Sequence, residues 1–180
     1  MGGVAMDNIL IEPGRSIGTI KLGMPKDKVN ECIQMYMQRY DDELERCFER
    51  FIFPEYDENQ KLIAVQVLRD LMEFANFICF GIDVFNTKAE KLIEIIDKIT
   101  PYLRTSEPEL GFDYDFAEVG LSFYRSNVFT EKEMEQEWFK VKSPEEQEDD
   151  MKYLYFETVM VCRLDYYDLL RKAREGTLLE

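Results

Sequence analysis

Two aspartates one residue apart, Asp113 and Asp115, are the residues of this sequence best placed to do chemistry. They alternate with Phe112, Tyr114 and Phe116, which is the pattern of a β-strand, so both carboxylates should lie on one face of a sheet. Two carboxylates on one face can share a divalent cation. A metal-dependent enzyme would need further carboxylates and a substrate pocket, so we favour the solvent face of a hairpin.

Two other groups of polar residues are weaker candidates. Asp83 lies in an apolar strand beside Gly81, where a buried carboxylate without a partner would have a raised pKa. We favour a hydrogen-bonded core aspartate over a general base at this position. Arg125, Tyr166 and Tyr167 could form a polar recognition surface or belong to an ordinary amphipathic surface.

Several kinds of site are excluded by what the sequence lacks. It has no histidine, which rules out a histidine base and any histidine-ligated metal. The glycines of residues 14–18 match neither phosphate-binding pattern, G-x-G-x-x-G or G-x-x-x-x-G-K. Residues 57–60 lack the glycine and the terminal glutamate of a calcium loop. We therefore predict no cofactor, no metal, no catalytic residue and no enzymatic activity.

The cysteines and the start of the chain both suit a cytoplasmic protein. No two cysteines have C-x-x-C spacing, so we expect buried, reduced thiols rather than a zinc site or a redox dithiol. They are Cys32, Cys47, Cys79 and Cys162. Residues 1–8 lack the basic and apolar regions of a secretory signal. No stretch approaches the roughly 18 apolar residues of a membrane span.

The net charge is strongly negative, at −15, with 37 acidic and 22 basic residues. Such a chain repels nucleic acid phosphates and anionic lipids, so we expect neither nucleic acid nor membrane as a partner. It favours a basic protein partner or cations. The alternative is that the acidity serves solubility alone.

Apolar periodicity and turn residues predict strands and two amphipathic helices. The expected strands are residues 16–23, 51–56, 61–68, 76–85, 112–116, 121–125 and 153–163. The expected helices are residues 25–47, with a break near residues 41–42, then 87–103, opened by a capping box at Thr87–Glu90, and a tail helix over residues 164–175. Pro54 indicates that residues 51–56 form an edge strand.

This order of elements predicts a single α+β domain over residues 1–180. We expect a mainly antiparallel sheet with one face covered by the two amphipathic helices. The order also suggests a duplicated unit of one helix plus three strands. The second helix should bury Ile93, Ile96 and Ile99 against a sheet that contains Ile82 and Val84.

An acidic insertion at residues 131–150 interrupts this pattern. It contains nine acidic and three basic residues and should be a solvated helix or loop, with Trp138 and Phe139 as an anchoring point. Adjacent like charges cannot be buried unpaired, so its acids should be exposed and able to steer a basic partner. The predicted partner-binding residues are Tyr124, Trp138, Phe139, Glu145, Glu146, Glu148, Asp149 and Asp150.

Four short phrases, at residues 17–24, 81–85, 120–125 and 155–159, carry a resemblance. They are Ile-Gly-Thr-Ile-Lys-Leu-Gly-Met, Gly-Ile-Asp-Val-Phe, Gly-Leu-Ser-Phe-Tyr-Arg and Tyr-Phe-Glu-Thr-Val. Together they resemble small uncharacterised proteins of Gram-positive bacteria, some of them linked to polymorphic toxin systems as immunity proteins. The first phrase also resembles the unit repeated in β-lactamase-inhibitor-protein-like folds. The resemblance implies no catalytic residue and does not extend to the acidic insertion.

The leading hypothesis from the sequence is an acidic cytoplasmic protein-binding module. It would act as an immunity protein does, by occluding a basic surface on a toxin or another basic partner. One alternative is a metal-dependent enzyme with its carboxylate site at Asp113 and Asp115. Another is a structural subunit that oligomerises through its aromatic surface. The sequence does not predict the oligomeric state.

Overall fold

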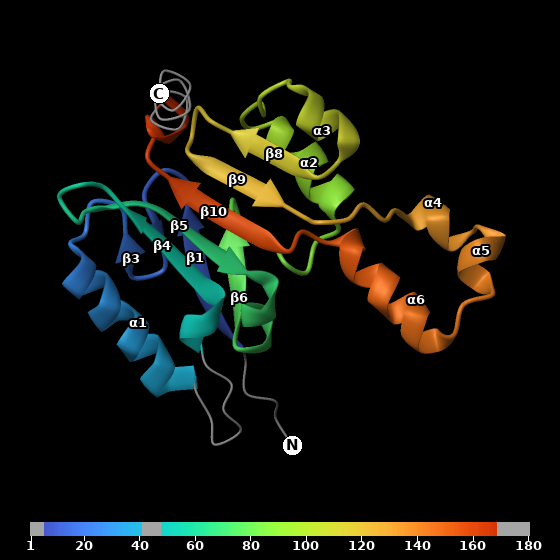
Figure 1. Cartoon of the computed structure of the whole chain (residues 1–180), viewed down its shortest axis with the longest axis horizontal. Helices are drawn as coiled ribbons and strands as arrows, with labels where there is room; N and C mark the ends of the chain where they lie inside the picture. Colours follow the sequence, from blue (N-terminus) through green and yellow to red (C-terminus); the bar gives the residue numbers. More distant parts are fainter. Residues whose placement is uncertain (1–5, 41–47, 169–180) are drawn as a thin grey trace, which may run out of the picture.

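Two β-sheets share one hydrophobic core in the computed structural model of the chain (Figure 1). The structure describes residues 6–40 and 48–168, with only the backbone for residues 106 and 107. Nearly all strand pairs are antiparallel, and helices are interspersed with the strands. The predicted α+β class is confirmed.

The strands divide into a small sheet and a large sheet of five strands each. The small sheet has the order β3 (Ile20–Lys21), β2 (Ser16–Ile17), β1 (Asp7–Glu12), β6 (Ala75–Cys79) and β7 (Ile82–Asp83). The large sheet has the order β4 (Ile52–Tyr56), β5 (Leu62–Leu68), β10 (Thr158–Cys162), β9 (Leu121–Tyr124) and β8 (Asp113–Phe116). Strand β4 lies at an edge, as Pro54 predicts.

The helices lie in the segments that connect these strands. They are α1 (Lys26–Tyr40), α2 (Ala89–Asp97), α3 (Ser106–Leu110), α4 (Glu131–Met134), α5 (Glu137–Lys140) and α6 (Pro144–Met151). Short 3-10 helices are η1 (Phe48–Phe51), η2 (Arg69–Glu73) and η3 (Lys152–Leu154). Residues 41–47 of the first predicted helix and 169–175 of the predicted tail helix lie outside the described residues. No helix among those described is both long and apolar enough to cross a bilayer.

The strands form two sheets where the sequence led us to expect one. The predicted helix-plus-three-strands order recurs only in outline, as α1, β4, β5, β6 and then α2, β8, β9, β10, because β7 follows the first set and further helices interrupt the second. All three strands of the second set lie in the large sheet. In the first set, β4 and β5 lie in the large sheet, whereas β6 belongs to the small sheet. It pairs in parallel with β1, with Ile9 opposite Phe77. The separate sheet therefore depends on a strand that precedes the first set.

One core lies between the two sheets, and both long helices contribute to it. Val29 and Ile33 of α1 and Leu92 and Ile96 of α2 are buried in this cluster. Every second residue of the central strands points inward, as expected for a sheet with one face on a core. These inward residues include Val65, Val67, Val159, Val161, Leu121 and Phe123 of the large sheet and Ile9, Ile11, Phe77 and Cys79 of the small sheet.

A contact between two glycines joins the turns of the two sheets. The Gly14 N–H donates to the Gly120 carbonyl at 3.2 Å. A Cβ added to Gly120 would lie 2.1 Å from the Cys162 carbonyl oxygen, and φ at Gly120 is +66°. Only glycine fits this position, because it has no side chain and tolerates the left-handed region. Gly120 begins the third phrase of the resemblance, so that phrase has a packing role here.

Helix α2 is shorter at both ends than predicted. It ends at Asp97, so Ile99 is 54% exposed while Ile96 is fully buried. The predicted burial of Ile99 is wrong, because the helical period stops before it. The predicted capping box is not formed either: Lys88 is the N-cap, and the Thr87 hydroxyl donates to the Asp83 carbonyl at 2.7 Å.

The described cysteines are free thiols, and two of the three are buried as predicted. Cys79 and Cys162 are buried, and burial raises the pKa of both thiols to about 12. Neither will form a reactive thiolate at neutral pH. Cys32 is half-buried, and Cys47 lies outside the described residues.

Replacing Ile96 with Ala should lower the free energy of unfolding by about 2–5 kcal/mol, because the change empties a fully buried site. The matched change Ile99→Ala, at an exposed position, should cost less than about 1 kcal/mol. Urea melts of both variants measure the difference. Equal losses in the two variants would mean that the buried face of α2 is assigned wrongly.

Candidate functional site

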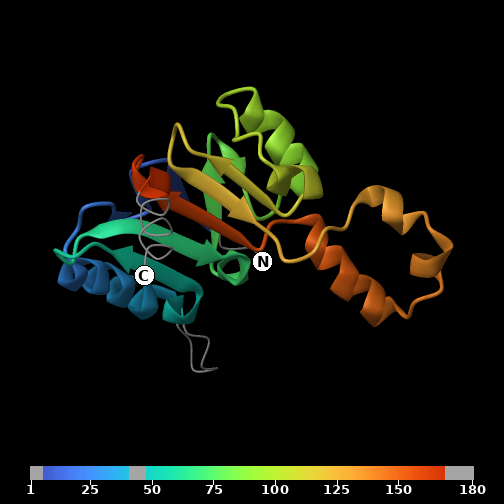
Figure 2. The same ribbon diagram turned by 45° about the horizontal axis from the view of Figure 1, so that its top comes forward.

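A helical arm leaves the large sheet between two strands that are direct neighbours. Tyr124 ends β9 opposite Thr158, which begins β10, so a short hairpin turn could join them. The chain instead makes a long excursion through α4, α5, α6 and η3, which projects from the body (Figures 1 and 2). We call residues 126–157 the arm. Binding residues are found disproportionately often on such connecting segments, so the arm is a candidate site.

A small core of its own holds the arm together. Phe129, Phe139 and Leu154 are buried in a cluster that is separate from the main core. The ring centroids of Phe129 and Phe139 are 5.1 Å apart. Phe139, predicted to contact a partner, therefore supports the arm from inside and offers little surface for binding.

Trp138 is the arm's exposed aromatic residue, with 46% of its surface accessible. Its indole packs edge-on against Phe129, and the Lys142 ammonium lies 5.0 Å from its ring centroid. The nearby Val141 is largely exposed. An indole that is packed against the arm on one side and exposed to solvent on the other is well suited to anchor a protein contact.

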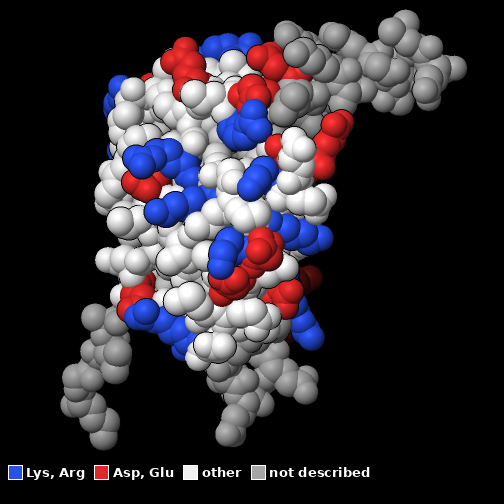
Figure 3. All heavy atoms as spheres, turned by 90° about the vertical axis from the view of Figure 1, so that its left-hand side faces the viewer, with Lys and Arg blue, Asp and Glu red and all other residues white. Residues whose placement is uncertain are grey.

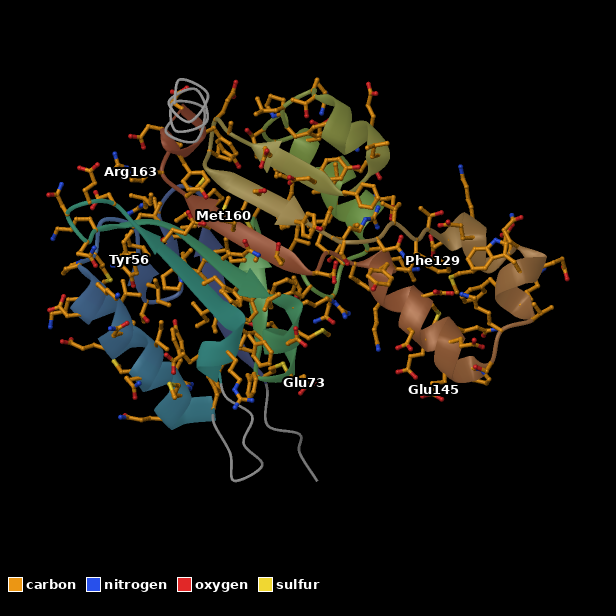
Figure 4. The ribbon with its side chains drawn as sticks, in the orientation of Figure 1. Tyr56, Glu73, Phe129, Glu145, Met160 and Arg163 are labelled. Carbon is orange, nitrogen blue, oxygen red and sulfur yellow. The ribbon has the colours of Figure 1, made fainter. Side chains whose placement is uncertain are left out.

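Helix α6 presents an acidic face to solvent. Glu145, Glu148 and Asp149 are spaced three and four residues apart, which places them on the same side of the helix. All three are exposed. Asp149 pairs with Lys152 at 2.5 Å, whereas Glu145 and Glu148 have no ion pair within the described part of the chain. Figure 4 shows Glu145 at the lower end of the arm, away from the body.

The other two acids of the predicted cluster hold the arm's own structure. Glu146 forms a capping box with Ser143, whose backbone N–H and then hydroxyl hold the pKa of Glu146 below its usual value. Asp150 is half-buried and pairs with Lys142 at 2.5 Å. Of the five predicted acids, three are therefore accessible to a partner, and Glu146 and Asp150 stabilise the arm itself.

Arg125 fixes the start of the arm. Its guanidinium is 2% exposed, so it cannot form the recognition surface considered from the sequence. It donates to the Gly111 carbonyl at 2.9 Å, to the Tyr153 carbonyl at 2.9 Å and to the Glu90 carboxylate at 2.7 Å. These bonds connect the arm to the body through α2 and the turn before β8.

Two further contacts support the arm at its base. Lys88, the N-cap of α2, forms an ion pair with Glu131 of α4. The Ser126 N–H donates to the carboxylate of Glu157, which links the two strands that enter and leave the arm. Together with Arg125, these contacts hold the arm in a defined position relative to α2.

Asp113 and Asp115 lie on one face of β8, as predicted, but they take part in hydrogen bonds. The Tyr167 hydroxyl donates to Asp115 at 2.6 Å. The Ser122 hydroxyl donates to Asp113 at 3.4 Å. Within residues 6–40 and 48–168, no group of three or more acids or cysteines is arranged to hold a metal ion. The arrangement favours a structural role for both carboxylates.

Two consecutive tyrosines bridge the edge strands of the large sheet. The Tyr166 hydroxyl donates to Glu55 of β4 at 2.8 Å, while Tyr167 reaches Asp115 of β8. Burial, followed by the neighbouring carboxylate, raises the pKa of each phenol. Residues 163–168 therefore cover part of the outer face, including Cys162.

Asp83 has hydrogen-bond donors, as we favoured from the sequence, but it is half-buried and does not lie in the core. The Asn86 side chain donates to it at 2.8 Å, and the backbone N–H groups of Phe85 and Asn86 donate at 3.3 Å. The carboxylate thus shapes the turn that precedes α2. Nothing in this geometry requires a general base.

A polar groove of about 480 Å³ lies between α1 and the small sheet. Two of its charged residues are paired with each other, since Arg39 lies 2.6 Å from Asp7. A Cβ on Gly18 would lie 2.1 Å from the Tyr36 hydroxyl, which accepts a hydrogen bond from the Thr19 N–H. The first phrase of the resemblance thus provides room for Tyr36. On this side of the molecule, basic and acidic side chains are interspersed (Figure 3).

No protein-family model, curated protein or solved structure matches this chain.

Calorimetric titration of the full chain with Mg²⁺, Mn²⁺ or Ca²⁺ should show no site tighter than about millimolar, because two hydrogen-bonded carboxylates are too few oxygen ligands. The Asp113→Asn variant should give the same traces as the parent protein. A micromolar site that this substitution abolishes would instead support the metal-dependent enzyme.

The buried phenols should make the protein less stable at high pH. Burial and then the hydrogen bond to Asp7 raise the pKa of Tyr40 to about 12, above the unfolded value of roughly 10. A raised folded pKa means that this stabilisation is complete below about pH 10 and is lost as the pH rises toward 12. Urea melts at pH 8 and pH 11 should show the decline, and Tyr40→Phe should make it shallower. If the stability of the variant depended on pH as that of the parent protein does, Tyr40 would not be the cause of the decline.

Proposed function

We propose that this protein is an acidic protein-binding module whose arm captures a basic surface on a partner protein. The observation that carries the proposal is the acidic face of α6 on an arm that also exposes Trp138. Apart from Phe156 at its end, which is buried in the main core, the arm packs around a separate core. The arm is therefore available for a task other than stabilising the body.

Charge favours a protein as the partner. A net charge of −15 repels phosphate backbones and anionic lipid surfaces, and it attracts proteins with clustered Lys and Arg. Exposed acids raise the rate of encounter with such proteins, while an aromatic anchor slows their release. Glu145 and Glu148 supply the first property, and Trp138 supplies the second.

The resemblance to immunity proteins supports a more specific form of the proposal. In this form, the protein acts in the cytoplasm and blocks a toxin by binding to it. This role needs no catalytic residue and no cofactor, and a basic toxin surface would match the acidic arm. In this form, the partner is a toxin whose basic surface the arm occludes.

Neutralising the acidic face of α6 should slow association with the partner by roughly tenfold at low salt and flatten the salt dependence of the rate. The test variant carries Glu145→Gln, Glu148→Gln and Asp149→Asn, which spares the structural acids of the arm. The partner is first captured from the native host with the full chain, and association is then measured by stopped flow at two salt concentrations.

A matched control has the same change in net charge at three exposed positions of the body. It carries Glu58→Gln, Asp70→Asn and Glu118→Gln. The control should slow association much less, because it leaves the local field of the arm intact. Equal rates in the parent protein and the arm variant would show that the arm is only a solubilising segment.

A further inference from the structure

The outer face of the large sheet has an uncharged centre. Figure 1 looks onto this face, with the small sheet behind it. The outward-facing residues of the three central strands are all uncharged. These residues are Ala64, Gln66 and Leu68 of β5, Thr158, Met160 and Cys162 of β10, and Ser122 and Tyr124 of β9. In a chain of which 33% of residues are charged, this absence sets the surface apart.

Part of this centre is accessible to solvent. Tyr166 and Tyr167 cover one end, where Ala64, Cys162 and Ser122 are buried. The accessible residues Gln66, Leu68, Met160 and Tyr124, together with Phe53 of the edge strand β4, form what we call the sheet patch. Phe53 and Tyr124 are well exposed, at 50% and 44%, and the other three are half-buried.

The strand register makes the sheet patch continuous. Phe53 lies opposite Gln66, which lies opposite Met160. In the neighbouring row, Leu68 and Tyr124 flank the buried Thr158. Directly opposed residues have Cβ atoms about 5 Å apart, so neighbouring side chains within a row lie within reach of one another. Figure 4 shows Met160 in the middle of this face.

Acidic residues border the sheet patch on both sides. Glu55 lies on β4, and Asp113 and Asp115 lie on β8, so the charges are on the two edge strands. Glu55 and Asp115 accept hydrogen bonds from the tyrosines at the covered end, and Asp113 lies opposite Tyr124 of the patch. In an antiparallel sheet with one face in solvent, the residues on that face are normally polar or charged. An aromatic and Met-containing centre inside a charged rim is instead the composition of a protein interface.

We propose that the sheet patch is a second contact surface for the basic partner that the arm captures. This inference rests on the proposed function. The acidic rim fits a partner with an apolar centre surrounded by Lys and Arg. A second copy of this chain fits poorly, because two acidic rims would repel each other.

Photo-crosslinking tests both surfaces separately. Benzoylphenylalanine replaces Phe53 or Tyr124 in the patch, Trp138 in the arm, or the control residues Leu10 and Met35. The controls are 58% and 64% exposed and lie on the small sheet and α1. Full-length proteins are irradiated in an extract of the native host, and the products are identified by mass spectrometry.

The patch and arm positions should crosslink to the same polypeptide, at segments rich in Lys and Arg, and the controls should not. Crosslinking from Trp138 alone would overturn the patch and leave the proposed function standing. Failure at every position would count against both. A product from the patch with twice the mass of this chain would assign the surface to self-association and overturn the inference.

Affinity measurements with the crosslinked partner, once purified, give the second test. Phe53→Arg should weaken binding by about tenfold or more, because it places a positive charge and a bulky side chain in the interface. Leu10→Arg is the matched control, since Leu10 is also an exposed apolar residue on an outward strand face. Equal affinity for both variants would overturn the patch, provided that their thermal melts match the parent protein.

Discussion

The buried guanidinium of Arg125 is the constraint on which the arrangement of α2, the arm and the end of the large sheet depends. A buried charge without partners is strongly unfavourable, so its N–H groups must find acceptors. The chain supplies two backbone carbonyls and one carboxylate, at Gly111, Tyr153 and Glu90. The Glu90 side chain is 50% exposed, so the pair is not fully desolvated. Satisfying one side chain thus brings three segments distant in sequence to one place.

This requirement explains why a local helix signal fails at the start of α2. The sequence Thr87–Glu90 has the pattern of a capping box, in which Glu90 would accept from the N-cap backbone. The Glu90 side chain is instead bound to Arg125, and Lys88 extends to Glu131 of the arm. A capping box contributes on the order of 1 kcal/mol. Arg125 is buried, so leaving its charge without Glu90 would cost more than the capping box contributes, and the tertiary interaction prevails.

The elements predicted correctly are those defined by local patterns. Alternation identified β8 and the carboxylates on its face, and the proline of β4 identified an edge strand. The second sheet was not predictable, because the parallel pairing of β1 with β6 joins segments whose patterns carry no information about each other. In the arm, charge density predicted exposed acids. Trp138 and Phe139 look alike in sequence, and only the orientation of α5 decides that Phe139 is buried.

The two proposed surfaces have complementary physical roles. Exposed charges are screened beyond about 8 Å at physiological salt, so the acidic face of α6 can raise the association rate but contributes little to the lifetime of a complex. Lifetime depends on desolvated, well-packed area, and a stable interface buries about 800 Å² on each partner. In the arm, Trp138 and Val141 are the only large exposed apolar residues, too few to supply the centre of such an interface. The sheet patch provides the additional apolar area. It includes Tyr124, the last residue of β9 before the arm, so one partner can contact the patch and the arm together.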